Sequence, residues 1–353
     1  MKYPEIIGFD DALPQLDAFD AIIDARSPSE YAEDHLPGAI NAPVLDDEQR
    51  IRIGTMYKQV SAFDAKKLGA ALVAKNIAAH IETLWMDKPR EWRPLIYCWR
   101  GGNRSGAMAH ILAKVGWPVA QLDGGYKAFR QHVNAELEQA PALNFKVVCG
   151  TTGSGKSRLL EVLHAQGAQV LDLEQLAAHR GSVLGSLPSQ PQPSQKAFES
   201  HIWNVLRRFD PARPVFVESE SKKVGQLRVP AALMDAMRAS DCIALTLSRA
   251  NRVRLLMEDY EHFLLSPATL NEQLDHLTPL HGREKIARWH ALSDTGDMAP
   301  LVGELLADHY DPAYLRSIDR NFTRYAQAAP LALDDIGDDA FTAAALQLIA
   351  TTY

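Results

Sequence analysis

Residues 145–157 have the sequence FKVVCGTTGSGKS. The apolar run before Gly150 predicts a buried strand, the glycines predict a tight loop, and a helix is expected to begin at Lys156. This order matches the phosphate-binding pattern G-x-x-x-x-G-K-[ST], in which backbone amides surround a diphosphate and the lysine neutralises it. We therefore expect a phosphate-binding loop, or P-loop, formed by Gly150, Thr151, Thr152, Gly153, Ser154, Gly155, Lys156 and Ser157.

Two further features complete this predicted phosphate site. The hydroxyl of Ser157 is a candidate ligand of Mg²⁺, because this position supplies a magnesium ligand in P-loops. Glu218 ends the apolar segment PVFVE and occupies a position like that of the acidic residue in a second nucleotide-binding motif. The chain has no clear base-recognition motif, so ATP or GTP is the default ligand and any other diphosphate stays open.

Strands and helices alternate along both halves of the chain. Residues 21–27 and 94–102 are apolar runs that end in polar or glycine-rich turns, and residues 103–117 have apolar positions at helical spacing. Such alternation favours parallel α/β sheets. We expect an α/β fold with two domains, residues 1–138 and 144–353, and a mainly helical part from about residue 250. The Ser-, Pro- and Gln-rich segment 182–195 is expected to be an exposed, mobile loop.

The composition is that of a globular protein. The 353 residues suit two domains, and the 46% apolar and 23% charged fractions lie in the globular range. A net charge of −7 argues against binding nucleic acid through overall charge, although a local basic surface stays open. The cysteines, Cys98, Cys149 and Cys242, form no C-x-x-C pair, so we expect a reducing cytoplasm rather than a disulfide framework. No signal peptide or membrane span is expected.

A second anion-binding loop is predicted around Cys98, in the sequence YCWRGGNRS (97–105). The cysteine ends a buried strand, so we expect it at the carboxyl edge of a parallel sheet, where α/β proteins bind ligands. Glycines allow the backbone to curl with its N–H groups inward, and the following helix adds its positive end. Such surroundings, with two arginines, stabilise a thiolate and bind an anion beside it. The expected loop comprises Trp99, Arg100, Gly101, Gly102, Asn103, Arg104 and Ser105.

The loop by itself leaves two interpretations of Cys98. The spacing Cys-x5-Arg to Arg104 is that of phosphatases that attack phosphate esters, and a persulfide carrier uses much the same loop. Three segments favour the carrier because they resemble, in the same order, the signature of rhodanese domains: IDARS (23–27), HLPGAINAP (35–43) and LDGGY (122–126). The Cys98 loop is longer than in many simple rhodaneses, which suits a larger oxyanion such as a phosphate-bearing donor.

A rhodanese-like domain followed by a P-loop NTPase-like domain resembles the bacterial tRNA 2-selenouridine synthase family. The resemblance covers nearly the whole chain. Besides the two loops, it rests on RIGTMYKQ (52–59), LEQLAAHRGS (173–182), FVESES (216–221) and MEDY (257–260).

The resemblance implies a two-step modification of tRNA that carries 2-thiouridine at the wobble position. A geranyl group from geranyl diphosphate is first attached to the sulfur, and the geranylated sulfur is then replaced by selenium from selenophosphate. Cys98 matches the essential rhodanese cysteine of this family. Both co-substrates are phosphorylated anions, so we expect the P-loop to hold geranyl diphosphate and the Cys98 loop to handle selenium. No tightly bound cofactor is expected.

Basic residues at the start of the predicted helical part are candidate tRNA contacts, namely Arg249, Arg252 and Arg254. Such a cluster is more often a solvated helix face. Three other functions stay open on the sequence: a P-loop kinase or NTPase with a regulatory rhodanese or phosphatase-like module, a cysteine-dependent phosphatase, and a non-catalytic tRNA-binding protein.

Overall fold

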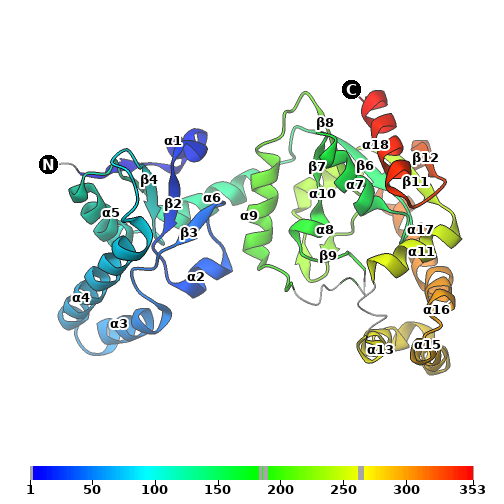
Figure 1. The fold of residues 1–353 in the computed structure, drawn as a ribbon, viewed down its shortest axis with the longest axis horizontal. Helices are drawn as coiled ribbons and strands as arrows, with labels where there is room; N and C mark the ends of the chain where they lie inside the picture. Colours follow the sequence, from blue (N-terminus) through cyan, green and yellow to red (C-terminus); the bar gives the residue numbers. More distant parts are fainter. Residues whose placement is uncertain (1–2, 183–184, 186–189, 261–265, 353) are drawn as a thin grey trace. The chain divides into compact units, whose positions relative to one another are not determined.

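A computed structural model describes residues 3–182, 185, 190–260 and 266–352. The chain forms two compact units (Figure 1). Unit 1 consists of Met1–Glu136 with Pro193–Asn204, and unit 2 consists of Leu137–Gln192 with Val205–Tyr353. The first domain was expected to end at residue 138, and the first segment of unit 1 ends at Glu136. Residues 193–204, however, were expected in the second domain and pack with the first.

Unit 1 is built on a parallel sheet in which neighbouring strands follow the order β1-β5-β4-β2-β3. All strands of a parallel sheet end at the same edge, so the residues that follow β2 and β4 meet there. Cys98 directly follows β4. The strands are β1 (Glu5–Ile7), β2 (Ala21–Asp24), β3 (Ala39–Asn41), β4 (Pro94–Tyr97) and β5 (Ala120–Leu122).

Local sequence sets the ends of several helices in unit 1. Ser27 and Glu30 form a capping box at the start of α2, with Pro28 at the first helical position. Asp46 caps α3 by accepting from the Gln49 N–H. The helices are α1 (Phe9–Ala12), η1 (Leu13–Ala18), α2 (Pro28–Glu33), α3 (Asp47–Gln59), α4 (Ala62–His80), η2 (Ile81–Trp85), α5 (Asn103–Val115), α6 (Gly125–Leu137) and α9 (Gln195–Leu206).

Helix α9 belongs to unit 1 through its buried face. The indole of Trp203 is 1% exposed and lies against the rings of Phe9 and Phe129. Its Nε1 donates to Glu136 Oε2 at 2.6 Å. The hydroxyl of Ser200 donates to the buried Asp34 at 3.0 Å. The sequence did not indicate this pairing, because the apolar stripe of a helix does not show which surface covers it.

Unit 2 has a second parallel sheet, in the order β12-β11-β6-β8-β7, with the P-loop directly after its central strand β6. The strands are β6 (Asn144–Cys149), β7 (Gln169–Leu171), β8 (Pro214–Glu218), β11 (Asp241–Leu247) and β12 (Ala329–Leu333), beside the hairpin of β9 (Lys223–Val224) and β10 (Leu227–Arg228). The expectation of parallel α/β sheets in both domains is confirmed. The segment of β12 was expected to be part of a mainly helical region. It pairs instead with β11, and tertiary pairing of this kind overrides the local pattern.

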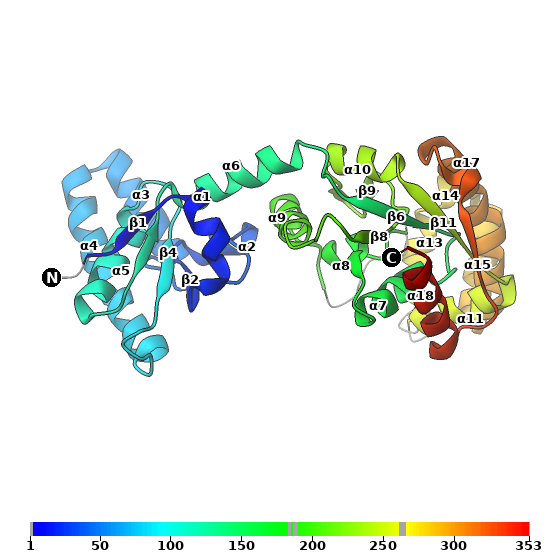
Figure 2. The same ribbon diagram turned by 90° about the horizontal axis from the view of Figure 1, so that it is seen from above.

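Helices lie on both faces of the unit 2 sheet, with α7 and α18 on one face and α10 on the other (Figure 2). The core between sheet and helices contains Phe216, Leu160 and Phe341. A separate helical cluster packs around Trp289, which is fully buried. The helices of unit 2 are α7 (Lys156–Ala165), α8 (Leu173–Leu176), α10 (Ala231–Arg238), α11 (Arg249–Asp259), α13 (Pro267–Asp275), α14 (Thr278–His281), α15 (Arg283–Thr295), α16 (Met298–Leu305), η3 (Leu306–Tyr310), α17 (Asp311–Asn321), η4 (Tyr325–Gln327) and α18 (Asp338–Thr352).

Two expectations concern particular segments. Residues 183–184 and 186–189 of the loop expected over 182–195 lie outside the described residues, and Gln195 already begins α9. Of the helices that the structure describes, none is both long and apolar enough to cross a membrane.

Replacing Trp203 by Ala tests the docking of α9 on unit 1. Removing a fully buried indole leaves a cavity, so we expect the free energy of unfolding to fall by about 3–5 kcal/mol. Urea denaturation measures this loss. The control Phe63→Ala removes a ring that is 70% exposed and should change stability by less than about 0.5 kcal/mol. Equal stability of the two variants would show that α9 does not pack on unit 1 in solution.

Candidate functional sites: two anion-binding loops

Cys98 lies at the carboxyl edge of the unit 1 sheet, as the sequence predicts. Its side chain is 3% exposed, and the Ser105 hydroxyl lies 3.3 Å from its sulfur. Within the described residues, the backbone N–H groups of residues 99–105 donate no hydrogen bond to the protein. These unpaired amides, together with the positive end of α5 that follows them, are suited to binding an anion near the thiol.

Two backbone hydrogen bonds hold this loop against α6. The Tyr126 N–H donates to the Cys98 carbonyl at 2.8 Å, and the Lys127 N–H donates to the Trp99 carbonyl at 3.0 Å. Gly125 makes this approach possible, because a Cβ at that position would lie 2.3 Å from the Cys98 carbonyl oxygen. The Trp99 ring, 43% exposed, stacks on Tyr126 with ring centroids 5.3 Å apart. The loop carbonyls are thus fixed on α6 while its amides stay unpaired.

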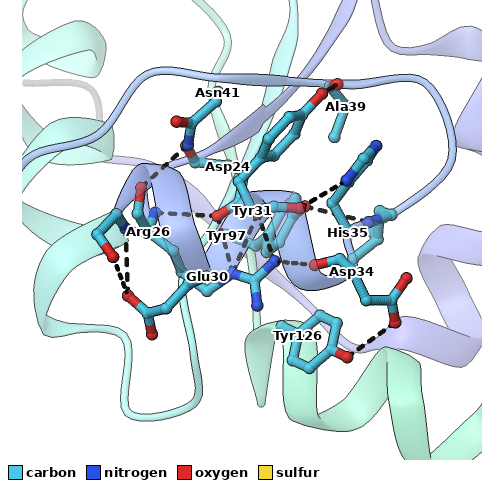
Figure 3. Close-up of polar contacts among 12 residues, drawn as sticks. Asp24, Arg26, Glu30, Tyr31, Asp34, His35, Ala39, Asn41, Tyr97 and Tyr126 are labelled. Carbon is cyan, nitrogen blue, oxygen red and sulfur yellow. Dashed lines mark hydrogen bonds and ion pairs between the residues drawn. The ribbon is translucent and has the colours of Figure 1, made fainter. Parts of the chain in front are cut away.

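A buried ion pair, Arg26 with Asp24, contacts residues next to the Cys98 loop, and Figure 3 shows its polar contacts. The Arg26 guanidinium is 1% exposed and donates to both carboxylate oxygens of Asp24, to Oδ1 at 3.0 Å and to Oδ2 at 2.6 Å. It also donates to the Asp34 carbonyl and lies 4.0 Å from the centre of the Tyr126 ring. Tyr97 precedes Cys98 in the chain, and its hydroxyl donates to the Asp24 carboxylate at 2.8 Å. Removing one member of such a pair leaves an uncompensated buried charge, at a cost of about 3–5 kcal/mol.

The two arginines of the Cys98 loop differ from the expectation that both add free positive charge. Arg104 donates to both oxygens of the Glu30 carboxylate, at 2.6 and 3.1 Å. Burial would raise the pKa of Glu30, but the Arg104 guanidinium outweighs it and holds that pKa below its usual value. Arg104 is therefore a neutralised support of the loop. Arg100 is exposed, and no ion pair within the described part of the chain holds it.

The remaining residues of the Cys98 loop differ from one another in solvent exposure. Gly101 and Asn103 are exposed, and Ser105 is buried. Gly102 caps α5 in the left-handed conformation with φ of 70°. Its carbonyl accepts from the Gln121 amide at 3.2 Å, so β5 also anchors the loop.

The P-loop of unit 2 repeats the pattern of unpaired amides. Only the Ser154 N–H donates within the loop, to the Thr151 carbonyl at 3.0 Å, among the described residues 151–157. The Lys156 ammonium donates to the Gly150 carbonyl at 2.8 Å. Gly155 has φ of 84°, and a Cβ there would lie 2.6 Å from the Phe341 ring, so only glycine fits. The loop can wrap a diphosphate, with Lys156 placed to turn toward it.

Arg252 holds the P-loop from the side of α11. Its guanidinium donates to the Thr152 carbonyl at 2.7 and 2.9 Å and to both oxygens of Asp311. The residue is 6% exposed, so the expectation that it contacts tRNA at the surface gives way to this structural role. Arg249 and Arg254 are exposed on the same helix. Arg249 donates to the Gly303 carbonyl, and Arg254 lies 3.4 Å from the Asp335 carboxylate.

A carboxylate that the sequence did not single out faces the P-loop. Glu174 is the second residue of α8 and accepts from the Ser157 hydroxyl at 2.8 Å. Glu218, the expected acidic residue, is fully buried and accepts from the Glu174 N–H at 2.9 Å, so it positions Glu174. The available signal was a pair of acidic residues, Asp172 and Glu174, within three positions of the end of the short strand segment QVL (169–171), at the carboxyl edge of the sheet.

Burial disfavours negative charge among these carboxylates. It raises the pKa of Glu174 to about 7, with a further contribution from Glu220, and the pKa of Asp172 to about 6. The same cause raises the pKa of Glu218 and of Glu220. These groups therefore favour either a proton or a cation beside the phosphate loop.

Ser157 and Glu174 would fit as ligands of a magnesium ion bound together with a diphosphate. Adjacent ligands of octahedral Mg²⁺ lie about 2.9 Å apart, close to the distance between Ser157 Oγ and Glu174 Oε2. Mg²⁺ takes one or two carboxylates together with substrate phosphates. Both residues line a cavity of about 640 Å³ that the P-loop bounds, a size typical of ligand sites. Among the described residues no cage of three acidic, His or Cys side chains is found.

The two units and their loops define a rhodanese-like domain joined to a P-loop domain. Residues 9–132 match the model of the rhodanese-like domain, and residues 143–281 match that of the tRNA 2-selenouridine synthase AAA domain.

Three proteins named tRNA 2-selenouridine synthase are similar to this chain. The Cupriavidus pinatubonensis protein is 33% identical over 86% of this chain and 90% of its own length. The Alcanivorax borkumensis protein is 32% identical over 83% and 88%, respectively. The Nitrosomonas europaea protein is 37% identical over 74% and 68%. This chain belongs to the tRNA 2-selenouridine synthase family.

The raised pKa values predict how stability depends on pH. Asp172 and Glu174 hold their protons to higher pH in the folded protein, so the free energy of unfolding falls as pH rises from about 4 to about 7. Glu174→Gln removes its share and should reduce this fall by on the order of 2 kcal/mol. Urea denaturation at pH 4.5 and 8 measures the difference. The control Glu272→Gln alters an exposed carboxyl and should leave the fall unchanged, and an unchanged fall in Glu174→Gln would contradict the assignment.

Proposed function

We propose that this protein modifies the wobble uridine of tRNAs that carry 2-thiouridine, in two chemical steps. The first attaches a geranyl group from geranyl diphosphate to the sulfur. The second replaces the geranylated sulfur by selenium from selenophosphate and yields 2-selenouridine. The observation that carries this proposal is the presence of two anion-binding loops with different side chains: the Cys98 thiol lies beside one loop, and the Lys156 ammonium belongs to the other.

In the proposed first step, the P-loop binds the diphosphate of the geranyl donor. A sulfur lone pair of 2-thiouridine forms a bond to C1 of geranyl as the C1–O bond breaks, and the electron pair leaves with diphosphate. The N3 proton of the base is lost to solvent. Negative charge builds up on the diphosphate, where the loop amides and Lys156 can stabilise it. Ser157 and Glu174 would hold Mg²⁺, which lowers the repulsion between diphosphate and the neighbouring carboxylates.

In the proposed second step, selenium exchange takes place at the Cys98 loop. The amides of residues 99–105 bind the phosphate part of selenophosphate beside the thiol. Geranylated thiouridine, selenophosphate and water give 2-selenouridine, geranyl thiol and phosphate, with no net oxidation or reduction. Alkylation in the first step turns the sulfur into a better leaving group, which explains why the geranyl step comes first.

Two variants separate the steps. Cys98→Ser should make geranylated tRNA and stop there, because the Cys98 loop loses its thiol. Lys156→Ala should lower geranylation by about 10²–10³-fold, since the diphosphate loses a charged stabiliser. Given tRNA that already carries the geranyl group, Lys156→Ala should still insert selenium. Mass analysis of nucleosides after incubation with 2-thiouridine tRNA and both co-substrates measures each product.

The matched control for Cys98→Ser is Cys242→Ala, which removes a buried thiol of unit 2. It should cost stability but leave both products unchanged. Failure of Cys98→Ser and Lys156→Ala at the same step would mean that one composite site replaces the two proposed here. Steady hydrolysis of ATP or GTP without tRNA would favour a P-loop NTPase instead.

We propose a tRNA surface that includes Arg249 and Arg254, both exposed on α11. Affinity should fall steeply with salt, because cations are released from the phosphates that the arginines contact. The double variant Arg249→Glu/Arg254→Glu should weaken tRNA binding by roughly tenfold and reduce the salt slope by about 2. Filter binding at salt concentrations from about 50 to about 200 mM measures the affinity and the salt slope. The control Arg90→Glu changes an exposed arginine of unit 1. If it weakens tRNA binding as much as the double variant does, the tRNA surface does not include Arg249 and Arg254.

A further inference from the structure

An apolar pocket adjoins the phosphate-binding cavity within unit 2. The walls of this pocket are almost wholly apolar and come from α11, α13, α16 and η3. Leu270, Leu301 and Leu305 belong both to these walls and to the buried core of the helical cluster around Trp289. Protein cores are normally filled to the density of organic crystals, and apolar cavities that stay unfilled bind apolar ligands.

The apolar pocket and the phosphate-binding cavity share part of their lining. Thr152, Ser182, Leu256, Tyr260 and Tyr310 border both spaces. Thr152 is itself a residue of the P-loop, and Arg252 fixes its carbonyl. A ligand with its diphosphate on the loop amides can therefore extend directly into the apolar pocket.

We infer that the apolar pocket, about 60 Å³ in volume, holds part of the hydrocarbon chain of an isoprenoid diphosphate, and that Val302 and Met298, which line this pocket and not the phosphate-binding cavity, contact that part of the chain. This inference rests on the proposed function of the P-loop. A nucleoside in the same place would need hydrogen-bond partners for its base and sugar, and the pocket offers only hydroxyl groups at its junction with the phosphate-binding cavity. A branched hydrocarbon chain needs none.

The junction also suits the reacting carbon of such a ligand. C1 joins the diphosphate to the chain, so it would lie where Tyr260 and Tyr310 border both spaces. C1 gains positive charge as its bond to oxygen breaks and before its bond to sulfur is complete. Aromatic rings attract a nearby cation, so a tyrosine at this junction can stabilise the carbon, although the Tyr260 ring already has the Arg180 guanidinium 4.8 Å from its centre.

Val302 provides the sharpest test because it lines the apolar pocket and not the phosphate-binding cavity. Each methylene that is buried contributes roughly fourfold to affinity. We therefore expect the wild-type protein to bind geranyl diphosphate at least about 30-fold more tightly than dimethylallyl diphosphate. Val302→Phe fills the pocket and should reduce this ratio at least about tenfold, while the affinity for inorganic diphosphate stays unchanged. Titration calorimetry measures all three ligands.

Val115→Phe is the matched control, because it makes the same change at a residue of α5 that is 58% exposed. It should leave all three affinities unchanged. If Val302→Phe lowers the melting temperature, Met298→Phe provides a second variant from the same pocket. An unchanged ratio in a folded variant would overturn the inference and show that the space is a packing defect.

The same titrations, together with the assay of geranyl transfer to tRNA, separate this inference from the proposed function. Suppose that Val302→Phe abolishes the chain-length preference but the wild-type protein does not transfer geranyl to tRNA. The inference about the pocket would then hold, and the proposed reaction would be rejected. Geranyl transfer that is equally fast in wild type and Val302→Phe would keep the reaction and reject the pocket.

Discussion

A set of inward-facing amides without protein acceptors is costly to maintain, because unpaired buried donors lose their hydration. Both loops of this protein meet that constraint by fixing their carbonyl groups instead. In unit 1 the Cys98 and Trp99 carbonyls accept from α6, which Arg26 supports through Tyr126. In unit 2 the Thr152 carbonyl accepts from Arg252, whose charge Asp311 balances. In each unit a buried arginine paired with an aspartate keeps a loop open for an anion.

The charges around the two loops differ in a way that matches different ligands. At the Cys98 loop Arg104 neutralises the Glu30 carboxylate, so this carboxylate does not repel an anion at the loop amides. The P-loop faces a carboxylate, Glu174, whose burial already favours a proton. A highly charged diphosphate can approach that group only with a cation or a proton between them. The Cys98 loop has no such requirement.

Helix α9 makes the two units interdependent in the chain. Its sequence lies between β7 and β8 of unit 2, yet Trp203 and Ser200 complete the core and the polar network of unit 1. Asp34, which accepts from Ser200, also accepts from Tyr126, the residue whose N–H holds the Cys98 carbonyl. The support of the cysteine loop therefore includes a helix that belongs, by sequence position, to the P-loop half.

The sequence by itself determined both loops, because strand–glycine–helix patterns are local and each residue's part follows from backbone geometry. It also determined the parallel α/β class and the positions of Cys98 and Lys156. Only the tertiary structure decided which charges remain free. In sequence, Arg104 could not be distinguished from Arg100, nor Arg252 from Arg249. In the structure, Glu30 neutralises Arg104 and Asp311 neutralises Arg252, each from a distant segment. The role of Glu174, the docking of α9, the strand β12 and the apolar pocket likewise depend on contacts between segments far apart in the chain, which no local pattern specifies.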